Sequence, residues 1–262
     1  MNKFDFLIIG AGGTGLSSAM YAARLGLKTL VLGANNGSEL PIGGVITMTD
    51  IVENFPGFRK ISGMELTKKM EEQARSYPLV SIKEERALRI ERKKNCCLVK
   101  TNKGIYQSRT ILFATGTKWK KLDVPGSEKF ERKGVYYCAL CDGPLFRRKT
   151  LAVVGSGDSA VKEALLLTGY AKKVYLIVRG EKVHPEPINL EKLKRNKKIE
   201  VITKTNIVEV KGDNVMKSII LDRAYKGKKE MNIDGIFISI GHVPLSELAK
   251  SAGVKVNEKD EI

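Results

Sequence analysis

The chain has 262 residues, 42% of them hydrophobic and 29% charged, a composition typical of a folded globular protein and not of a disordered one. Its 46 lysines and arginines exceed the 29 acidic residues by 17. Because these basic residues are spread along the chain, nucleic-acid binding is disfavoured. A positive surface instead favours attraction of anionic nucleotides or of an acidic protein partner. No apolar run is long enough to span a membrane, and four cysteines are too few for a disulfide scaffold, so we expect a cytoplasmic protein without membrane contact.

A strand, a glycine turn, a helix and a second strand are predicted at the start of the chain. Residues 6–9 form a continuous apolar run of the kind found in buried parallel strands. Residues 16–25 have helical spacing with many small side chains, and Gly26 supplies a stop signal. Residues 29–32 read as the next strand. This βαβ unit implies a parallel sheet with a right-handed crossover.

The turn between the first strand and the helix has the spacing of a dinucleotide-binding loop. Gly10 permits the tight turn, Gly12 lets backbone amides approach a pyrophosphate, and Gly15 lets helix and strand pack closely. An acidic residue usually ends the second strand of such a unit and holds a ribose. Gly33 occupies that position, and the nearest acid is Glu39, in an irregular segment.

Two strands that end in glycine bracket a second module. Residues 98–113 predict strands with a turn at Gly104, followed by Gly116, and residues 235–240 predict a strand followed by Gly241. We interpret these two glycine exits as the points where the chain enters and leaves an inserted domain.

The inserted segment repeats the opening pattern. A strand at residues 151–154, a glycine turn at 155–160, a helix at 161–167 and a strand at 174–178 form another nucleotide-binding unit. After its second strand, Arg179 and Lys182 suit a 2′-phosphate, whereas Glu181 suits a free ribose hydroxyl. These signals conflict and leave NADPH and NADH both open.

Cys138 and Cys141 form a C-x-x-C pair, whose spacing allows a reversible disulfide across a turn. Asp142 follows directly, and its carboxyl group can exchange protons with a thiolate. Two buried thiols are the alternative. A zinc site would need a second pair of ligands, and the adjacent Cys96 and Cys97 have poor spacing for it, so we expect no metal. Alternation along a strand predicts opposite faces and no redox role for Cys96 and Cys97.

The residues after Gly241 predict a helix at 245–252 and the beginning of a strand or hairpin. A domain that is interrupted at Gly116 and resumes at Gly241 needs more chain than this to close its sheet. We therefore expect a chain that is truncated at its C-terminus.

The order of these motifs resembles that of the low-molecular-weight thioredoxin reductases, flavoenzymes with two interleaved nucleotide-binding domains. The matching segments are residues 10–15, 43–44 with 52–57, 114–116, 138–143, 155–160, and 240–242 with Pro244. The resemblance implies an α/β protein of two Rossmann-like three-layer domains, the second inserted into the first. It implies an FAD-binding domain at residues 1–116 and 242–262, its C-terminal part missing, an NAD(P)-binding domain with the cysteine pair at 117–241, and a homodimer.

The resemblance also implies a reaction. Electrons pass from NAD(P)H through FAD to the Cys138–Cys141 disulfide and then to thioredoxin or a thioredoxin-like protein, with the inserted domain rotating about connections near Gly116 and Gly241. Cys141 becomes the flavin-proximal sulfur, Cys138 the thiolate that attacks the partner, and Asp142 the acid and base. The alternatives are a related flavin and dithiol oxidoreductase with another donor or partner, or a truncated, non-catalytic dinucleotide-binding protein.

The resemblance places cofactor contacts on the glycine turns and their neighbours. These positions are Gly10, Gly12, Gly13, Thr14, Gly15, Gly43, Gly44, Val45, Asn54, Thr115, Gly116, Gly155, Gly157, Asp158, Ser159, Ala160, Arg179, His184 and Gly241.

Four departures from the family pattern weaken parts of this interpretation. Val45 stands where the family often has glutamine, and Leu245 where it has asparagine. The basic cluster for a 2′-phosphate is reduced to Arg179 and His184, because Val178 and Gly180 occupy its other positions. The terminal Gly-Asp flavin-binding motif is absent, which puts the strength of FAD binding in doubt.

Overall fold

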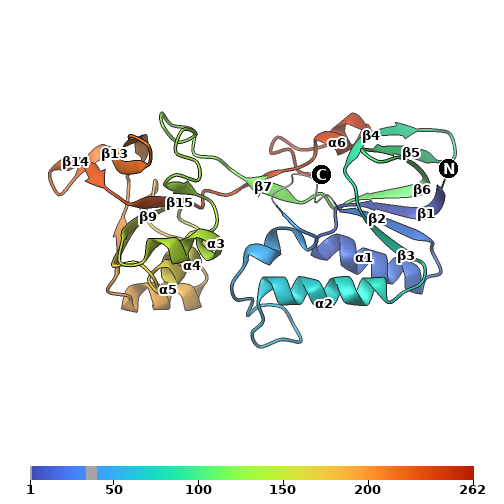
Figure 1. Ribbon diagram of the computed structural model, residues 1–262, viewed down its shortest axis with the longest axis horizontal. Helices are drawn as coiled ribbons and strands as arrows, with labels where there is room; N and C mark the ends of the chain where they lie inside the picture. Colours follow the sequence, from blue (N-terminus) through green and yellow to red (C-terminus); the bar gives the residue numbers. More distant parts are fainter. Residues whose placement is uncertain (1, 34–39) are drawn as a thin grey trace. The chain divides into compact units, whose positions relative to one another are not determined.

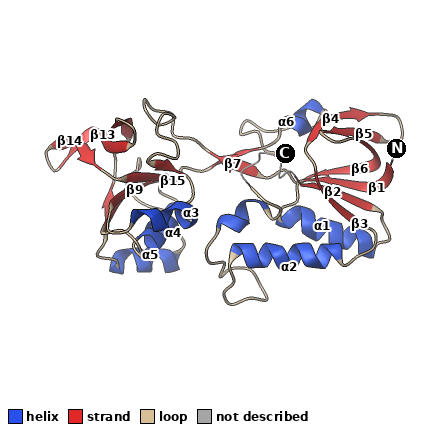
Figure 2. Cartoon of the chain, viewed as in Figure 1, coloured by secondary structure: helices blue, strands red, loops and turns tan. Residues whose placement is uncertain are grey.

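A computed structural model describes residues 2–33 and 40–262. The chain forms two compact units, which are coloured along the sequence in Figure 1. Unit 1 comprises Met1–Lys118 together with Val243–Ile262, and unit 2 comprises Trp119–His242. Helices and strands alternate in both units (Figure 2). No helix among the described residues is long and apolar enough to cross a membrane.

Unit 1 is built on a six-stranded sheet with the order β3-β2-β1-β6-β5-β4. Strands β3, β2, β1 and β6 are parallel, whereas β5 and β4 continue the sheet in antiparallel pairing. The strands are β1 (Asn2–Ile9), β2 (Thr29–Gly33), β3 (Val80–Glu84), β4 (Ala87–Arg92), β5 (Cys97–Thr101) and β6 (Ile105–Phe113). The helices are α1 (Gly13–Arg24), the 3₁₀ helix η1 (Gly44–Met48), α2 (Gly63–Arg75) and α6 (Glu247–Ser251).

The apolar run of β1 is buried on both faces of this sheet. Ile8 packs with Ala19 of α1 on one face, while Leu7 and Ile9 pack on the other face in a cluster that includes Leu248 of α6. Because alternate residues of a strand point to opposite faces, a strand covered on both sides has to be apolar at every position. This is the reason that the continuous run predicts a central strand.

Unit 2 is built on a five-stranded, all-parallel sheet with the order β11-β10-β9-β15-β8. Its strands are β8 (Val135–Tyr136), β9 (Thr150–Val154), β10 (Lys173–Ile177), β11 (Ile199–Ile202) and β15 (Gly235–Ile238). The helices are α3 (Ala139–Asp142), the 3₁₀ helix η2 (Gly143–Phe146), α4 (Asp158–Leu167) and α5 (Pro187–Arg195). A separate antiparallel sheet consists of β12 (Ile207–Gly212), β13 (Met216–Tyr225) and β14 (Lys228–Asn232).

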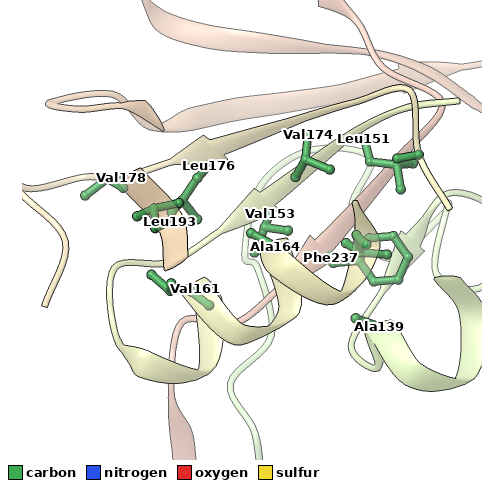
Figure 3. Packing of buried hydrophobic residues seen from close by; sticks show 13 residues of the cluster. Ala139, Leu151, Val153, Val161, Ala164, Val174, Leu176, Val178, Leu193 and Phe237 are labelled. Carbon is green, nitrogen blue, oxygen red and sulfur yellow. The ribbon is translucent and has the colours of Figure 1, made fainter. Parts of the chain in front are cut away.

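The helices and the antiparallel sheet cover opposite faces of the parallel sheet of unit 2. Leu151 and Val153 of β9 pack against α4, as Figure 3 shows for Val153, Ala164 and Val161. Ala152, between them, belongs to the cluster that the antiparallel sheet contributes to. Unit 2 therefore has three layers: the helices, the parallel sheet and the antiparallel sheet. Strand β9 is buried on both faces, as β1 is in unit 1.

The chain passes between the units through two short strands that pair with each other. These are β7 (Thr117–Trp119) and β16 (His242–Pro244). The pairing is extended by the Lys120 N–H, which donates to the carbonyl oxygen of Gly241 at 2.9 Å, and by the Leu245 N–H, which donates to that of Gly116 at 3.0 Å. Gly116 and Gly241 both have positive φ, 68° and 107°, which explains why glycine is found at each end of the ribbon.

The expected strand after the last helix is not formed. Residues 252–262 contain turns, with the Asp260 N–H donating to the carbonyl oxygen of Asn257 at 3.0 Å. A strand needs a neighbouring edge to satisfy its backbone groups, and among the described residues no strand pairs with this segment. The preceding helix is also shorter than expected, because Leu245 pairs with Gly116 instead of starting it.

Candidate active site

The redox pair lies at the start of the short helix α3. Cys138 caps the helix and forms a disulfide with Cys141, the two Cα atoms being 5.4 Å apart. The backbone N–H of Cys141 donates to Sγ of Cys138 at 3.1 Å. Such a donor stabilises negative charge on the sulfur that accepts it, so it favours a thiolate at Cys138 once the disulfide is opened. The disulfide expected from the C-x-x-C spacing is therefore present.

The two sulfurs of the pair differ in access. Cys138 is buried, with only 8% of its surface exposed, whereas Cys141 is exposed. The hydrogen bond thus favours Cys138 as the thiolate, whereas exposure favours Cys141 as the cysteine that a partner protein contacts. An assignment of Cys138 as the attacking thiolate requires that opening of the disulfide uncovers it.

The environment of Asp142 raises the pKa of its carboxyl group. Its side chain is half-buried, and burial raises the pKa of this carboxyl above its ordinary value, against the opposing charge of Arg132. Burial also raises the pKa of Tyr136, and the negative charge of Asp142 adds to that effect. A carboxyl group with a raised pKa, one residue after Cys141, suits proton transfer in disulfide chemistry.

In the first glycine turn, the fold requires glycine at positions 10 and 15 but not at position 12. A Cβ on Gly10 would lie 2.0 Å from the carbonyl oxygen of Ala114, and one on Gly15 would lie 1.9 Å from that of Gly10. Gly12 is different, because its φ is −80° and a Cβ there would meet no atom of the described residues closer than 3.8 Å. Neither strain nor crowding by the protein requires glycine at position 12. The open space above it, at a helix N-terminus without a side-chain cap, fits a pyrophosphate.

A second pair of glycines borders this space. The Gly43 N–H donates to the carbonyl oxygen of Ala11 at 2.8 Å, and Gly43 and Gly12 form a β-bridge. Gly43 and Gly44 have φ of 110° and 69°, and a Cβ on Gly44 would lie 3.4 Å from Cα of Gly12. The structure therefore brings two motifs some thirty residues apart to one edge of the sheet, where β1 ends.

The other positions predicted in unit 1 are placed around this edge or farther along the chain. Thr115 directly follows Ala114, and its hydroxyl donates to the carbonyl oxygen of Leu245 at 2.6 Å. Asn54 is exposed in a turn between Val52 and Ile61, which bridge each other. Gly13 and Thr14 begin α1, Val45 lies in η1, and Gly116 and Gly241 end the connecting ribbon. Glu39 lies outside the described residues.

The second glycine turn has the same construction. Gly155 has a φ of 150°, and a Cβ there would lie 2.2 Å from the carbonyl oxygen of Ser239 and 2.8 Å from Cβ of Ala160. Gly157 has a φ of −81° with nothing within 4 Å of a Cβ position, and it begins α4 without a side-chain cap. Gly157 corresponds to Gly12 in this respect, so the open space above it also fits a pyrophosphate.

Of the remaining predicted positions in unit 2, two are engaged in internal contacts. The Asp158 carboxylate accepts from the Glu186 N–H at 2.9 Å and from Nδ2 of Asn189 at 2.7 Å, and it pairs with Lys162 at 2.7 Å. The His184 N–H donates to the carbonyl oxygen of Ser156 at 2.6 Å. Asp158 therefore ties the start of α5 to α4, and the backbone at His184 is hydrogen-bonded to the glycine turn. Arg179 and Ser159 are exposed.

Comparisons with known proteins decide the family. The profile of the family described as pyridine nucleotide-disulphide oxidoreductase matches residues 4–262. The chain belongs to this family. It is 36% identical over 261 residues to the thioredoxin reductase of Bacillus subtilis (strain 168), covering 97% of this chain and 79% of that protein. It is 37% identical over 257 residues to a 34.2 kDa protein in the rubredoxin operon of Clostridium pasteurianum, covering 98% and 82%.

Two solved structures share the fold of this pyridine nucleotide-disulphide oxidoreductase. Thioredoxin reductase of Lactococcus lactis (FR conformation) matches with a TM-score of 0.90 and 34% identity, covering 98% of this chain and 83% of that one. Thioredoxin reductase of T. acidophilum matches with a TM-score of 0.90 and 30% identity, covering 99% and 84%. The resemblance and the α/β fold of two Rossmann-like parts are confirmed. The protein is a flavoprotein disulfide reductase that uses FAD and NAD(P)H.

Sequence reasoning missed Lys204, which lies beside the segment predicted to contact the adenosine ribose of the nicotinamide nucleotide. Its Nζ lies 2.7 Å from Oε1 of Glu181, and its N–H donates to the carbonyl oxygen of Gly180 at 2.8 Å. No motif marks Lys204, because only the parallel pairing of β10 with β11, with Ile177 opposite Ile202, brings it beside residues more than twenty positions earlier.

Proposed function

We propose that this flavoprotein is a thioredoxin-disulfide reductase, which passes electrons from NAD(P)H through FAD and the Cys138–Cys141 disulfide to thioredoxin or a thioredoxin-like protein. The observation that carries the proposal is the disulfide at the start of α3, followed directly by Asp142, whose pKa burial raises. It is supported by relatives and solved structures that bear the name thioredoxin reductase.

In this proposal each unit binds one of the two cofactors. Gly12, Gly43 and Gly44 of unit 1 would hold the pyrophosphate of FAD, and Gly157 of unit 2 would hold that of the nicotinamide dinucleotide. Support comes from the open space at Gly12 and Gly157, where glycine is not required by the protein itself. When bound, FAD supplies a relay that accepts a hydride from NAD(P)H and delivers the electron pair to a disulfide.

The cysteine pair then carries the disulfide chemistry. Two electrons and two protons open the Cys138–Cys141 bond to a dithiol. The Cys138 thiolate, stabilised by the Cys141 N–H, attacks one sulfur of the partner disulfide, so that a mixed disulfide forms and one partner thiolate leaves. Cys141 then attacks Cys138 of the mixed disulfide, releases the second partner thiolate and restores the original bond. Asp142 supplies and recovers a proton in these steps.

We propose NADPH as the donor in preference to NADH. The carboxylate that would hold a free ribose hydroxyl, Glu181, is paired with Lys204 at 2.7 Å, while Arg179 and Lys182 are exposed on the same segment. Three cations and one acid give this segment a net positive charge, which favours a 2′-phosphate. Lys204 thus replaces part of the basic cluster that Gly180 has lost. Titration with adenosine 2′,5′-bisphosphate and with AMP, in wild type and Lys204→Ala, tests this; equal affinities in wild type would contradict it.

We further propose a cytoplasmic homodimer. The dimer rests on the resemblance to the thioredoxin reductases, and the compartment is supported by Cys96 and Cys97, which are adjacent free thiols of the kind kept reduced in the cytosol. Light scattering during size-exclusion chromatography measures the molar mass of the holoprotein, and the mass of a monomer would exclude the dimer.

Substitution of each cysteine tests the function directly. We expect Cys138→Ser and Cys141→Ser to abolish reduction of thioredoxin, because neither can re-form the disulfide, while NAD(P)H still bleaches the flavin absorbance. Cys96→Ser is the matched control and should leave both reactions unchanged. Thioredoxin reduction that persists in either variant, or a purified wild-type protein without flavin, would contradict the proposed function.

A further inference from the structure

Gly33 leaves no room for the acid that usually ends the second strand of a dinucleotide-binding unit. A Cβ at position 33 would lie 2.5 Å from Cβ of Ala11, in the first glycine turn, and 3.5 Å from Cγ1 of Ile42. Any side chain on Gly33 would therefore have to displace the turn. A ribose at this edge of the sheet has to take its acid from another part of the chain.

Glu84 lies directly opposite Gly33 on the neighbouring strand. Strands β2 and β3 are parallel and adjacent (Figure 1), with Gly33 paired to Glu84. Two residues earlier, Val31 is paired to Ile82, and both pack in a cluster that includes Ala11. Because alternate residues of a strand face the same side, Glu84 is on the side of the sheet where the glycine turn lies. Neighbouring strands are about 4.8 Å apart, which a glutamate side chain spans.

The carboxylate of Glu84 is not used within the molecule, in contrast to its neighbours. Nζ of Lys83 donates to the hydroxyl of Tyr106 at 3.0 Å. The buried Glu85 carboxylate accepts from the hydroxyls of Tyr106 at 2.8 Å and Thr101 at 2.7 Å. Glu84 is exposed, and within residues 2–33 and 40–262 its carboxylate makes no hydrogen bond or ion pair. Its charge is therefore available to a ligand at this edge.

We infer that Glu84 binds a hydroxyl group of the adenosine ribose of FAD, in place of the acid that Gly33 does not supply. The inference rests on the proposed function and names the residue that recognises the ribose. Strands β1, β2 and β3 are parallel, so the glycine turn after β1 and Glu84 at the end of β3 lie at the same edge of the sheet. A carboxylate that accepts from a hydroxyl makes a charge-assisted hydrogen bond, which is stronger than a neutral one.

Flavin titration of the full-length apoprotein tests the inference. Glu84→Ala should raise the Kd of FAD by about tenfold or more, because a hydrogen bond to a charged group is lost. The Kd of FMN, which has no adenosine, should be unchanged. Glu91→Ala is the matched control, since Glu91 is exposed on β4 at the opposite edge of the same sheet. It removes an equal charge and should change neither Kd.

A competition experiment separates contact with the ribose from a general effect of the substitution. ADP, 2′-deoxy-ADP and 3′-deoxy-ADP each compete with FAD for the apoprotein, so that only binding at the flavin site is counted. With wild type, at least one deoxy compound should compete about tenfold more weakly than ADP. With Glu84→Ala, the three compounds should compete equally, because the group that distinguishes them is gone.

The inference is overturned if Glu84→Ala leaves the Kd of FAD unchanged, weakens FAD and FMN equally, or still prefers ADP over both deoxy compounds. Glu39→Ala is measured beside it, and loss of the preference for ADP in that variant alone would assign the ribose to Glu39 and refute the role of Glu84. In each of these cases wild type binds FAD and the proposed function stands. A wild-type protein that binds no FAD refutes both.

Discussion

Glu163 makes the stability of unit 2 depend on pH in an unusual direction. This residue lies on α4, which packs against the disulfide helix α3. Its Oε2 atom is buried and has no hydrogen-bond partner among the described residues. Burial raises the pKa of the Glu163 carboxyl from 4.5 to about 8, so the folded protein carries this group protonated at neutral pH.

The size of the effect follows from the two pKa values. Between pH 4.5 and about 8 the folded state binds a proton at Glu163 that the unfolded state has lost, so stability falls as the pH rises through this window. Each pH unit inside the window changes the free energy of unfolding by about 1.4 kcal/mol. From pH 5 to pH 8, Glu163 therefore lowers the stability of unit 2 by about 3 kcal/mol. Glu163→Gln has no proton to lose and lacks this contribution.

Urea unfolding measures the difference. Trp119 is the only tryptophan in the sequence; it lies in unit 2 and stacks on Tyr137, so its fluorescence follows that unit. The free energy of Glu163→Gln minus that of wild type should increase by about 3 kcal/mol between pH 5 and pH 8. Glu128→Gln, on an exposed site of the same unit, should show no such trend. A difference that stays constant across this range would refute the reasoning that burial governs Glu163.

Four further substitutions test other parts of the structure. Gly12→Ala should lose flavin, measured by absorbance, while its apoprotein melts at the same temperature as the wild-type apoprotein, since bound flavin itself adds stability. Gly15→Ala should be destabilised by roughly 3 kcal/mol or more in thermal unfolding, because its Cβ would meet a backbone oxygen at 1.9 Å. Wild-type turnover of thioredoxin should fall as the pH rises through the raised pKa of Asp142, and Asp142→Asn should be roughly 100-fold slower with a flat pH profile. Tyr106→Phe should destabilise unit 1 by about 1–3 kcal/mol in thermal unfolding, because the buried Glu85 carboxylate loses the hydroxyl that donates to it at 2.8 Å.

The features that sequence reasoning predicted are those encoded locally. Residues 6–9 and 151–154 are apolar at every position because each strand is covered on both faces. The two glycine turns follow from the space that a Cβ would need at Gly10, Gly15 and Gly155. The disulfide follows from the three-residue separation of its cysteines. In each case the residue type itself shows the constraint, even where the atoms that impose it come from a distant part of the chain, as the carbonyl oxygen of Ala114 does at Gly10.

The features that were missed depend on pairing between distant segments. Lys204 reaches Glu181 only because β11 lies beside β10, and nothing in its immediate sequence marks it. The hydrogen bonds of Asp158 were not predicted either, because α5 has to fold back before Asn189 and the Glu186 N–H can bind its carboxylate. The burial of Glu163 likewise depends on what covers α4, which helical periodicity alone does not specify. Charged residues on ordinary helices and loops therefore give the least information until the tertiary contacts are known.

The paired strands β7 and β16 also bear on how such a molecule can arise. Every strand of the six-stranded sheet of unit 1 lies before the insertion, in residues 2–113, and the inserted stretch starts and finishes at neighbouring points, since Lys120 and Gly241 share a backbone hydrogen bond. A segment whose two ends abut can be gained, lost or exchanged by recombination at a single surface site of its host. A few residues joining position 118 directly to position 243 would then close the host chain, and the excised stretch could be carried by another protein through an equally short linker.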